Sequence, residues 1–307
     1  MEVNEELRLS LAGSSYLESA CSADTASLYS ISHCYWAGRT PYSEVVIAES
    51  PVFGKVLFLD KEIQSAESDE AIYHEHLVHP VLRATDHVAS KRVLIVGGGE
   101  AATAREVLKW SRAAVAHVDW VDIDRDLVDL CRRHLSWADD PVYNDSRLAF
   151  FGEDIRSFFA RSEDLYDVII LDLPDPDVDT LRGSAEDTTD YILYSKSFFQ
   201  QVRAHLKMGG AVVSHAGPIS PGGDPEVNRE GLTWIRERVA DAGLGDGQAY
   251  HTFIPSFQSE WGFWMSAAPS SEGVLPLELV VMDDGAQSAA FHWPNFWNSP
   301  FIGHVGR

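Results

Sequence analysis

The sequence predicts an α/β fold, in which a parallel sheet follows a small antiparallel β unit. Three observations lead to this prediction. From residue 92 onwards, apolar runs of strand length alternate with amphipathic segments of helix length, as they do in βαβ units. The first of these runs leads into three consecutive glycines, residues 97–99, and then into a helical segment. Residues 42–64, in contrast, hold short strands separated by turns.

The composition is that of an ordinary globular chain. Of its 307 residues 45% are hydrophobic and 23% are charged, and no apolar run approaches the ~20 residues that a membrane span needs. The acidic N-terminus lacks the basic and apolar regions of a signal peptide. Cys21, Cys34 and Cys131 do not have the spacing of metal ligands, which favours reduced thiols. We therefore expect a cytoplasmic protein with no membrane contact.

The formal net charge of −23 limits the possible partners. Binding to nucleic acid needs clustered Lys and Arg, so this charge argues against nucleic acid as a partner. It suits a small cationic substrate, which an acidic protein steers toward its site. The alternative explanation is that the acidity serves solubility or life in a salty cytoplasm.

The N-terminal part is predicted to form a small β-strand domain. Its strands are expected at residues 42–49, 55–59 and 62–64. Residues 1 to about 30 show only weak periodicity and predict no particular element. We place the domain boundary so that residues 1–85 form the N-terminal region and residues 86–307 form the Rossmann-like α/β domain.

Residues 69–80 are helical in pattern, with Tyr73 and His76 on one face. His74, His76 and His79 in this segment are candidate metal ligands. Their spacing differs from the i, i+4 pair of the familiar helical zinc motif. We therefore expect no metal site.

The turn from Gly97 to Gly99, between a strand at residues 92–96 and a helix, is typical of a ligand-binding loop. Glycines let the backbone approach a ligand closely, and the first turn of the helix offers free N–H groups. The spacing lacks the last glycine of GxGxxG, because residue 102 is Ala. A site for the pyrophosphate of a dinucleotide is therefore disfavoured.

Acids follow the next two strands. The second strand, at residues 117–122, ends in Asp122, whose position suits the two hydroxyls of a ribose. Asp124 is instead expected to cap the following helix. The third strand, at residues 147–151, precedes Asp154, which would accept the amino group of adenine. A glycine loop, a ribose acid and a third-strand Asp in this order form the nucleoside pocket of S-adenosylmethionine-type folds.

The central strand of the prediction is the apolar run at residues 168–171, which resembles a strand buried on both faces. Pro174 cannot continue a central strand, so Asp172 and Asp175 should lie just past its carboxyl end. Ligands of open α/β sheets bind in that place. The alternative is an Asp-rich turn of solvated surface residues.

The remaining segments complete the α/β pattern. Residues 177–190 are acidic and aperiodic, and we expect a mobile lid over the site there. The further predicted elements are a helix at 195–207 that Gly209-Gly210 ends, a strand at 211–217, a helix at 226–242 and strands at 249–253 and 261–267.

Together these motifs resemble the polyamine aminopropyltransferase family, of which spermidine synthase is the type member. The resemblance covers about residues 42–267 and rests on Tyr42-Ser-Glu44, Val56–Asp60, Ile63-Gln64, Asp69–Glu75, Gly97–Glu100, Asp154, Asp172–Pro176, Ile254–Phe257 and Trp261–Phe263. Several details are closer to the thermospermine synthase branch, including His215–Pro218, where that branch has Gln in place of His215. The resemblance implies a Rossmann-like, S-adenosylmethionine-type methyltransferase fold with a seven-stranded sheet and a small N-terminal antiparallel β domain.

The resemblance also implies decarboxylated S-adenosylmethionine as aminopropyl donor, a di- or polyamine as acceptor and methylthioadenosine as product. Asp172 would be the catalytic base that takes the proton of the attacking amine, and Asp175 would hold the acceptor's nitrogen. The implied donor site is Gln64, His74, Gly97, Gly99, Glu100, Asp122 and Asp154, and the implied acceptor site is Tyr73, Asp175, Phe257 and Trp261. We expect a homodimer or homotetramer with no permanently bound cofactor. We also expect no metal, because the sulfonium is already a good leaving group.

The chain departs from the family pattern at several positions. Ala101-Ala102 stands where Gly-Gly is usual, which narrows the space near the donor. Ser43 replaces a Gln, Phe257 replaces a Tyr, and residues 177–180 replace a Gly-Pro segment. These differences leave the identity of the acceptor open, including amines larger than putrescine.

Two other functions share the predicted nucleoside pocket. One is methyl transfer from S-adenosylmethionine to an amine, which Glu100 disfavours because an acid beside the donor tail would repel a carboxylate. The other is a polyamine or nucleoside binder without turnover, against which the presence of both Asp172 and Asp175 argues.

Overall fold

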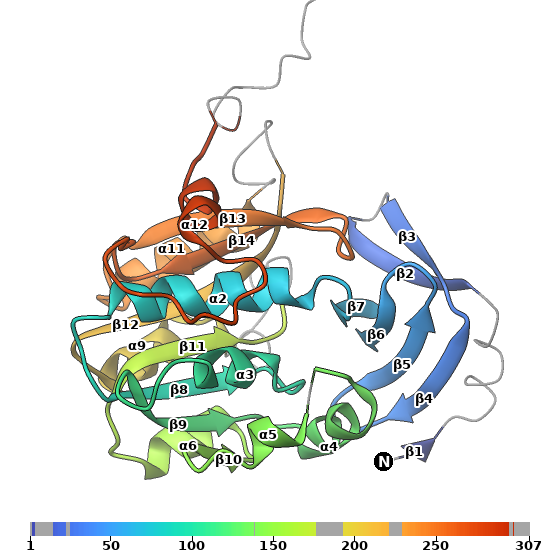
Figure 1. The fold of residues 1–307 in the computed structure, drawn as a ribbon, viewed down its shortest axis with the longest axis horizontal. Coiled ribbons are helices and arrows are strands. Elements are labelled where there is room, and N and C mark those ends of the chain that lie inside the picture. The colour runs from blue at the N-terminus through green and yellow to red at the C-terminus, as the bar shows by residue number, and fades with distance from the viewer. Residues whose placement is uncertain are drawn as a thin grey trace, which may run out of the picture.

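The computed structural model describes residues 2–3, 15–22, 25–137, 139–175, 193–220, 229–294 and 297, with side chains from residue 27 onwards. Within these ranges a large helix-covered sheet lies beside a smaller antiparallel sheet (Figure 1). The cavity described below lies between them.

The larger sheet has seven strands in the order β10-β9-β8-β11-β12-β14-β13. They are β8 (Lys91–Gly97), β9 (Val115–Val121), β10 (Leu148–Phe151), β11 (Tyr166–Asp172), β12 (Leu206–Ile219), β13 (Gln248–Ile254) and β14 (Ser259–Met265). The strands from β10 to β12 run parallel, whereas β14 is antiparallel to both β12 and β13. This arrangement confirms the predicted Rossmann-like fold with a seven-stranded sheet.

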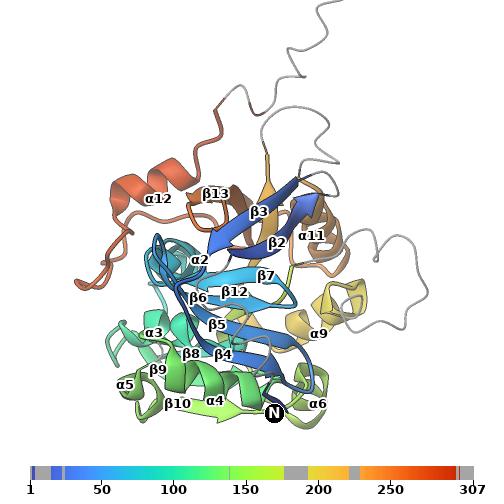
Figure 2. The same ribbon diagram turned by 90° about the vertical axis from the view of Figure 1, so that its right-hand side faces the viewer.

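Helices cover both faces of this sheet (Figures 1 and 2). They are α2 (Glu70–Ala84), α3 (Ala102–Leu108), α4 (Arg125–His134), α5 (Asp140–Tyr143), α6 (Ile155–Arg161), α9 (Lys196–Ala204), α11 (Glu230–Asp241) and α12 (Asp284–Ala290). In β8, Val93 and Ile95 join the apolar core that includes α2, α3 and α4, whereas Leu94 and Val96 join the core that includes α6, α9 and α11. Alternate residues of a strand point to opposite faces, which is why an uninterrupted apolar run forms this strand.

The N-terminal sheet is antiparallel and has the order β1-β4-β5-β6-β7, with a separate β2-β3 hairpin. Its strands are β1 (Glu2–Val3), β2 (Ser15–Ser22), β3 (Thr25–Ser30), β4 (His33–Arg39), β5 (Glu44–Ser50), β6 (Gly54–Leu59) and β7 (Glu62–Ala66). The predicted strands correspond to β5, β6 and β7, and those before them were not predicted. The small antiparallel β domain is therefore confirmed, with more strands than expected.

Helix α2 is longer than the predicted segment at residues 69–80, because it continues through Pro80 to Ala84. Proline has no N–H to donate to the carbonyl four residues earlier, that of His76. The hydroxyl of Tyr250 on β13 donates to this carbonyl instead, at 2.9 Å. The helix thus keeps a partner for that carbonyl and packs on the large sheet, with Leu77 and Val81 fully buried.

The predicted helix at residues 195–207 ends at Ala204, and Gly209-Gly210 lie inside β12, so they do not end the helix as expected. Gly209 has φ +81°, and a side chain on Gly210 would meet the backbone of β11.

The predicted lid at residues 177–190 lies outside the described residues. No helix in the described part of the chain is both long and apolar enough to cross a membrane.

Candidate active site

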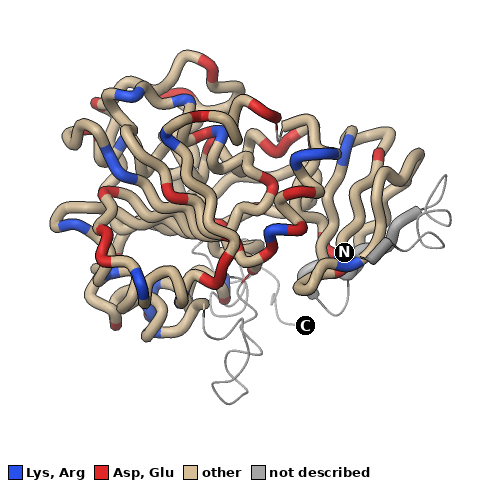
Figure 3. The backbone as a smooth tube through the Cα atoms, turned by 90° about the horizontal axis from the view of Figure 1, so that it is seen from below, with Lys and Arg blue, Asp and Glu red and all other residues tan. Residues whose placement is uncertain are grey.

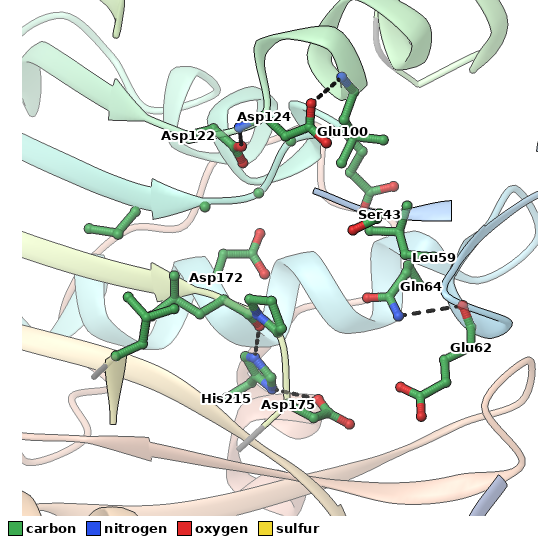
Figure 4. Close-up of a pocket in the computed structure, with 18 of the residues that line it drawn as sticks. Ser43, Leu59, Glu62, Gln64, Glu100, Asp122, Asp124, Asp172, Asp175 and His215 are labelled. Carbon is green, nitrogen blue, oxygen red and sulfur yellow. Dashed lines mark hydrogen bonds and ion pairs between the residues drawn. The ribbon is translucent and has the colours of Figure 1, made fainter. Parts of the chain in front are cut away.

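A cavity of about 860 Å³ opens at the carboxyl ends of β8, β9 and β11, with β6 and β7 of the N-terminal sheet on its other side (Figure 4). Its acidic lining residues are Asp60, Glu62, Glu100, Asp122, Asp124, Glu153, Asp154, Asp172, Asp175 and Glu230, and its basic ones are Arg156 and His215. In Figure 3 red acidic segments lie along the junction of the two sheets. A cavity with this excess of carboxylates suits a cationic ligand.

The glycine loop lies directly against the end of the central strand. The backbone N–H of Gly98 donates to the carbonyl of Asp172 at 2.8 Å. A Cβ on Gly97 would lie 2.0 Å from that carbonyl oxygen, and one on Gly98 would lie 2.7 Å from the carboxylate Oδ2 of Asp172. Both glycines also have positive φ. Gly97 and Gly98 are therefore required by the close approach of β8 to β11.

Asp172 is held by two hydroxyl groups. Tyr73 on α2 donates to Oδ1 at 2.8 Å, and Thr103 on α3 donates to Oδ2 at 2.5 Å. Burial, together with the neighbouring Asp172 carboxylate, raises the pKa of Tyr73 well above its ordinary value, so Tyr73 stays a neutral donor. The carboxylate is thus fixed in orientation. Thr103 was not foreseen, although its place in the first turn after the glycine loop marks it as a neighbour.

Asp175 follows Asp172 by three residues and faces His215 on β12. The imidazole Nδ1 is 3.5 Å from Asp175 Oδ1, and its Nε2 donates to the carbonyl of Leu173. Burial raises the pKa of Asp175, and His215 partly opposes this rise. Figure 4 shows Asp175 and His215 on one side of Asp172, with Asp122, Asp124 and Glu100 on the other. The two halves of the cavity therefore meet at Asp172.

Glu100 lines the cavity, and His74 lies behind it. His74 is 1% exposed and is not among the lining residues, so it reaches the cavity only through Glu100, and its donor-binding role stays a prediction. Its Nε2 lies 2.8 Å from Glu100 Oε1, and its Nδ1 lies 3.0 Å from Glu70. Although burial opposes the charge, these two carboxylates raise the pKa of His74 well above its ordinary value, so it is an imidazolium at neutral pH. Trp137, which was also not predicted, donates to Glu100 Oε2 at 2.9 Å.

The two acids after β9 lie in different surroundings: the predicted cap by Asp124 is confirmed, and the ribose role of Asp122 stays a prediction. Asp124 caps α4 by accepting the N–H of Leu127 at 3.0 Å, and Thr40 donates to its other oxygen. Asp122 lines the cavity, is 8% exposed and accepts the backbone N–H of Asp124 at 2.7 Å. Burial raises the pKa of Asp122 to about 6, and the Asp124 and Asp172 carboxylates add to this rise. A diol that donates to this carboxylate would favour its charged form.

Asp154 also lines the cavity, but its carboxylate already has partners. It caps α6 by accepting the N–H of Arg156 at 2.8 Å, and the Arg156 guanidinium contacts both of its oxygens, at 2.5–3.1 Å. The guanidinium holds the pKa of Asp154 below its ordinary value. The amino group of an adenine would therefore share Asp154 with Arg156, and the adenine role of Asp154 stays a prediction.

The acceptor residues expected from the sequence form an aromatic wall. Phe257 and Trp261 line the cavity with ring centroids 4.7 Å apart, and Tyr73 lies 6.2 Å from Phe257. Trp261 stacks on His215 at 6.2 Å with the ring planes at 16°. Gln64 on β7 reaches the cavity from the N-terminal sheet. The structure thus brings all the predicted site residues together, and all of them except His74 line the cavity.

Comparisons with known proteins place this site in a family. The family model described as "Spermine/spermidine synthase domain" matches residues 70–274, and the one described as "Spermidine synthase tetramerisation domain" matches residues 18–67. The chain belongs to the spermine/spermidine synthase family. The thermospermine branch stays a prediction.

Curated relatives agree with this assignment. "Polyamine aminopropyltransferase 2" of Pseudomonas aeruginosa is 37% identical over 78% of this chain, and the match spans 64% of that protein, somewhat less than two thirds of its length. "Polyamine aminopropyltransferase" of Saccharolobus islandicus is 38% identical over 73% of this chain and 69% of its own length. "Polyamine aminopropyltransferase 2" of Hyperthermus butylicus is 38% identical over 83% of this chain and 76% of its own length.

Solved structures confirm the fold. The spermidine synthase from Thermotoga maritima superposes with a TM-score of 0.77 at 23% identity, covering 92% of both chains. A spermidine synthase in complex with the transition state analogue AdoDATO has a TM-score of 0.77 at 21% identity and the same coverage. At these identities the likeness establishes the fold, so function is argued from the site.

Proposed function

We propose that this chain is an aminopropyltransferase that moves an aminopropyl group from decarboxylated S-adenosylmethionine to a di- or polyamine and releases methylthioadenosine. The observation that carries the proposal is the position of Asp172, held between a nucleoside half of the cavity and an amine half. Asp122 and Glu100 lie in the first half and Asp175 in the second. Curated relatives of the chain are named polyamine aminopropyltransferases, which supports the proposal.

In the proposed reaction Asp122 binds the ribose hydroxyls, and Glu100 binds the ammonium at the end of the donor's propyl chain. Asp175 binds the acceptor and brings its nitrogen toward Asp172. An alkylammonium has a pKa near that of Lys, about 10.4, so it must lose a proton before its lone pair can attack. Asp172 accepts this proton, and Tyr73 and Thr103 hold its two oxygens in a fixed orientation for the transfer.

The transfer step is a single displacement. The amine nitrogen forms a bond to the propyl carbon that is attached to the sulfonium, and the carbon–sulfur bond breaks. The electron pair stays on sulfur, which leaves as the neutral thioether of methylthioadenosine. The protein contributes positioning and proton acceptance, which together account for large rate enhancements. No permanently bound cofactor enters the proposal.

Methyl transfer from S-adenosylmethionine is the alternative. Glu100 remains the discriminating residue, because it lines the cavity while His74 and Trp137 hold its two oxygens. The carboxylate of S-adenosylmethionine would lie against this acid, whereas the decarboxylated donor presents only an ammonium there. The His74 charge is shared with Glu70, so it does not cancel the preference.

Mass spectrometry of the products tests the proposal. The protein is incubated with decarboxylated S-adenosylmethionine and, in turn, with putrescine, spermidine and longer amines. The expected result is release of methylthioadenosine together with an acceptor that has gained one aminopropyl group. Absence of both products with every amine would refute the proposal. We further propose that the enzyme is cytoplasmic. We also propose that it forms a homodimer or homotetramer, and the match to a tetramerisation domain supports an oligomer.

A further inference from the structure

His215 stands out because its geometry leaves one position for a proton unfilled. The residue lies on β12, is 2% exposed and faces the acceptor half of the cavity. Its Nε2 must carry a proton, because a carbonyl oxygen, that of Leu173, can only accept. Its Nδ1 is buried without a hydrogen-bond partner and lies 3.5 Å from Asp175 Oδ1 (Figure 4).

The contact between Nδ1 and Asp175 is favourable only when a proton lies between the two atoms. A neutral imidazole with its proton on Nε2 presents a lone pair at Nδ1, and a carboxylate oxygen presents only lone pairs. Two such acceptors repel each other, and Nδ1 is shielded from water. The missing proton can lie on either member of the pair, as an imidazolium or as a carboxylic acid, or it can come from an N–H of a bound ammonium.

We propose that an ammonium group of the acceptor amine displaces this proton, so that amine binding at Asp175 is coupled to loss of a proton from the His215–Asp175 pair. This inference rests on the proposed function and identifies His215 as the positioning residue of its acceptor site. In the free enzyme the pair holds one proton between Nδ1 of His215 and Oδ1 of Asp175. In the complex the ammonium donates one N–H to Asp175 and another to Nδ1, and the proton of the pair passes to solvent. An ammonium nitrogen can lie about 2.9 Å from both atoms.

Around His215, the part of the chain that the structure describes supplies no other group that could fill this role. From α2, Tyr73 presents its ring at 5.9 Å, while its hydroxyl donates to Asp172. From β14, Trp261 stacks on the imidazole and presents no acceptor. Beyond Asp175, the Tyr194 hydroxyl is committed to the carbonyl of Pro174 at 2.7 Å. Among the described residues, Asp175 is therefore the titratable group with which His215 can exchange a proton.

The coupling has a kinetic consequence that a purely structural histidine would not produce. Imidazoles generally change charge between about pH 5 and pH 8. Where the free enzyme holds an imidazolium, a proton must leave before the amine binds, so the KM of the amine rises about tenfold for each unit of pH decrease. The kcat at saturating amine is not affected by this step. A glutamine at this position would donate to the same partners without a titration.

Calorimetry with matched variants tests the proposal. Spermidine and putrescine are titrated into protein saturated with methylthioadenosine, at about pH 6.5 and in two buffers of different ionisation enthalpy. The wild-type protein is expected to release up to one proton more per amine than His215→Gln. His251→Gln is the control, because His251 forms a similar pair with Glu260 at 2.9 Å outside the cavity lining, and it should behave as wild type.

A second readout does not depend on a variant. The NMR signal of the His215 ring proton is followed with pH in the wild-type protein, with and without spermidine. The expected result is that spermidine moves the pH-dependent change of the ring signal toward lower pH. Equal proton release by wild type and His215→Gln, or an imidazole whose charge does not respond to the amine, would overturn the role of His215. Product formation by the wild-type enzyme is measured separately, so failure of this proposal is distinguished from failure of the proposed function.

Discussion

Replacement of Asp172 by Asn tests the proposed base with little change in structure. The two oxygens of Asp172 accept hydroxyl hydrogen bonds from Tyr73 and Thr103, at 2.8 and 2.5 Å. An amide keeps one acceptor, and its NH₂ group faces the other hydroxyl, which can rotate to accept. The variant therefore loses at most about one neutral hydrogen bond, and its unfolding free energy should fall by about 1 kcal/mol or less.

The effect of Asp172→Asn on catalysis should be much larger. An amide cannot take a proton from an alkylammonium, and general-base catalysis typically contributes about 10²–10⁴-fold. This range corresponds to about 2.7–5.4 kcal/mol in activation free energy. We expect kcat at neutral pH to fall by that factor, while the Kd of methylthioadenosine stays within about twofold of the wild-type value.

The assay measures methylthioadenosine release at saturating donor and amine, from about pH 7 to pH 10. Raising the pH should partly rescue the variant, because solvent then deprotonates the amine. The control is calorimetric binding of methylthioadenosine to the same preparation. A variant with near-native kcat at neutral pH would refute the assignment of Asp172 as base, and loss of nucleoside binding would show that the substitution acts through the fold.

Donor affinity, measured by calorimetry, should fall about tenfold for each pH unit below 6. The reason is that Asp122, with a pKa of about 6, must release a proton before a ribose can bind, so Asp122→Asn should abolish this dependence. Gly98→Ala should lower kcat more than donor affinity, because the new Cβ would lie 2.7 Å from Asp172 Oδ2. Because the φ of Gly98 is +70°, the free energy of unfolding in chemical denaturation should also fall by about 1–2 kcal/mol. An unchanged kcat would contradict this prediction. Glu75→Gln should lower stability by about 1.5–3 kcal/mol, seen as a lower Tm with unchanged KM, because Glu75 accepts three backbone N–H groups of residues 280–282.

Elements with a strong local signature were predictable from the sequence. The apolar runs of β8 and β11 reflect burial on both faces, which leaves no polar alternation to confuse the pattern. The end of β11 at Asp172 follows from Pro174, because a proline cannot donate to a neighbouring strand. These two strands place the central acid and the glycine loop side by side, so the core of the site was also predictable.

Features that depend on distant parts of the chain were not predictable. The continuation of α2 past Pro80 depends on the hydroxyl of Tyr250, which lies 174 residues from its partner His76. The position of His74 behind Glu100 depends on how α2 packs against the glycine loop, where Glu100 contacts both His74 and Trp137. Periodicity identifies the face of a helix on which a residue lies. It does not say whether a side chain on that face reaches the cavity or a residue that lines it.

The central claim is that the aminopropyl-bearing donor reacts at Asp172. It is tested most directly by a competition assay in which the wild-type protein receives equal amounts of decarboxylated S-adenosylmethionine and S-adenosylmethionine together with spermidine. Both nucleoside products are separated by chromatography and quantified. The predicted result is methylthioadenosine as the nucleoside product, with an amine that carries an added aminopropyl group, and loss of both in Asp172→Asn. Formation of S-adenosylhomocysteine with a methylated amine would contradict the assignment.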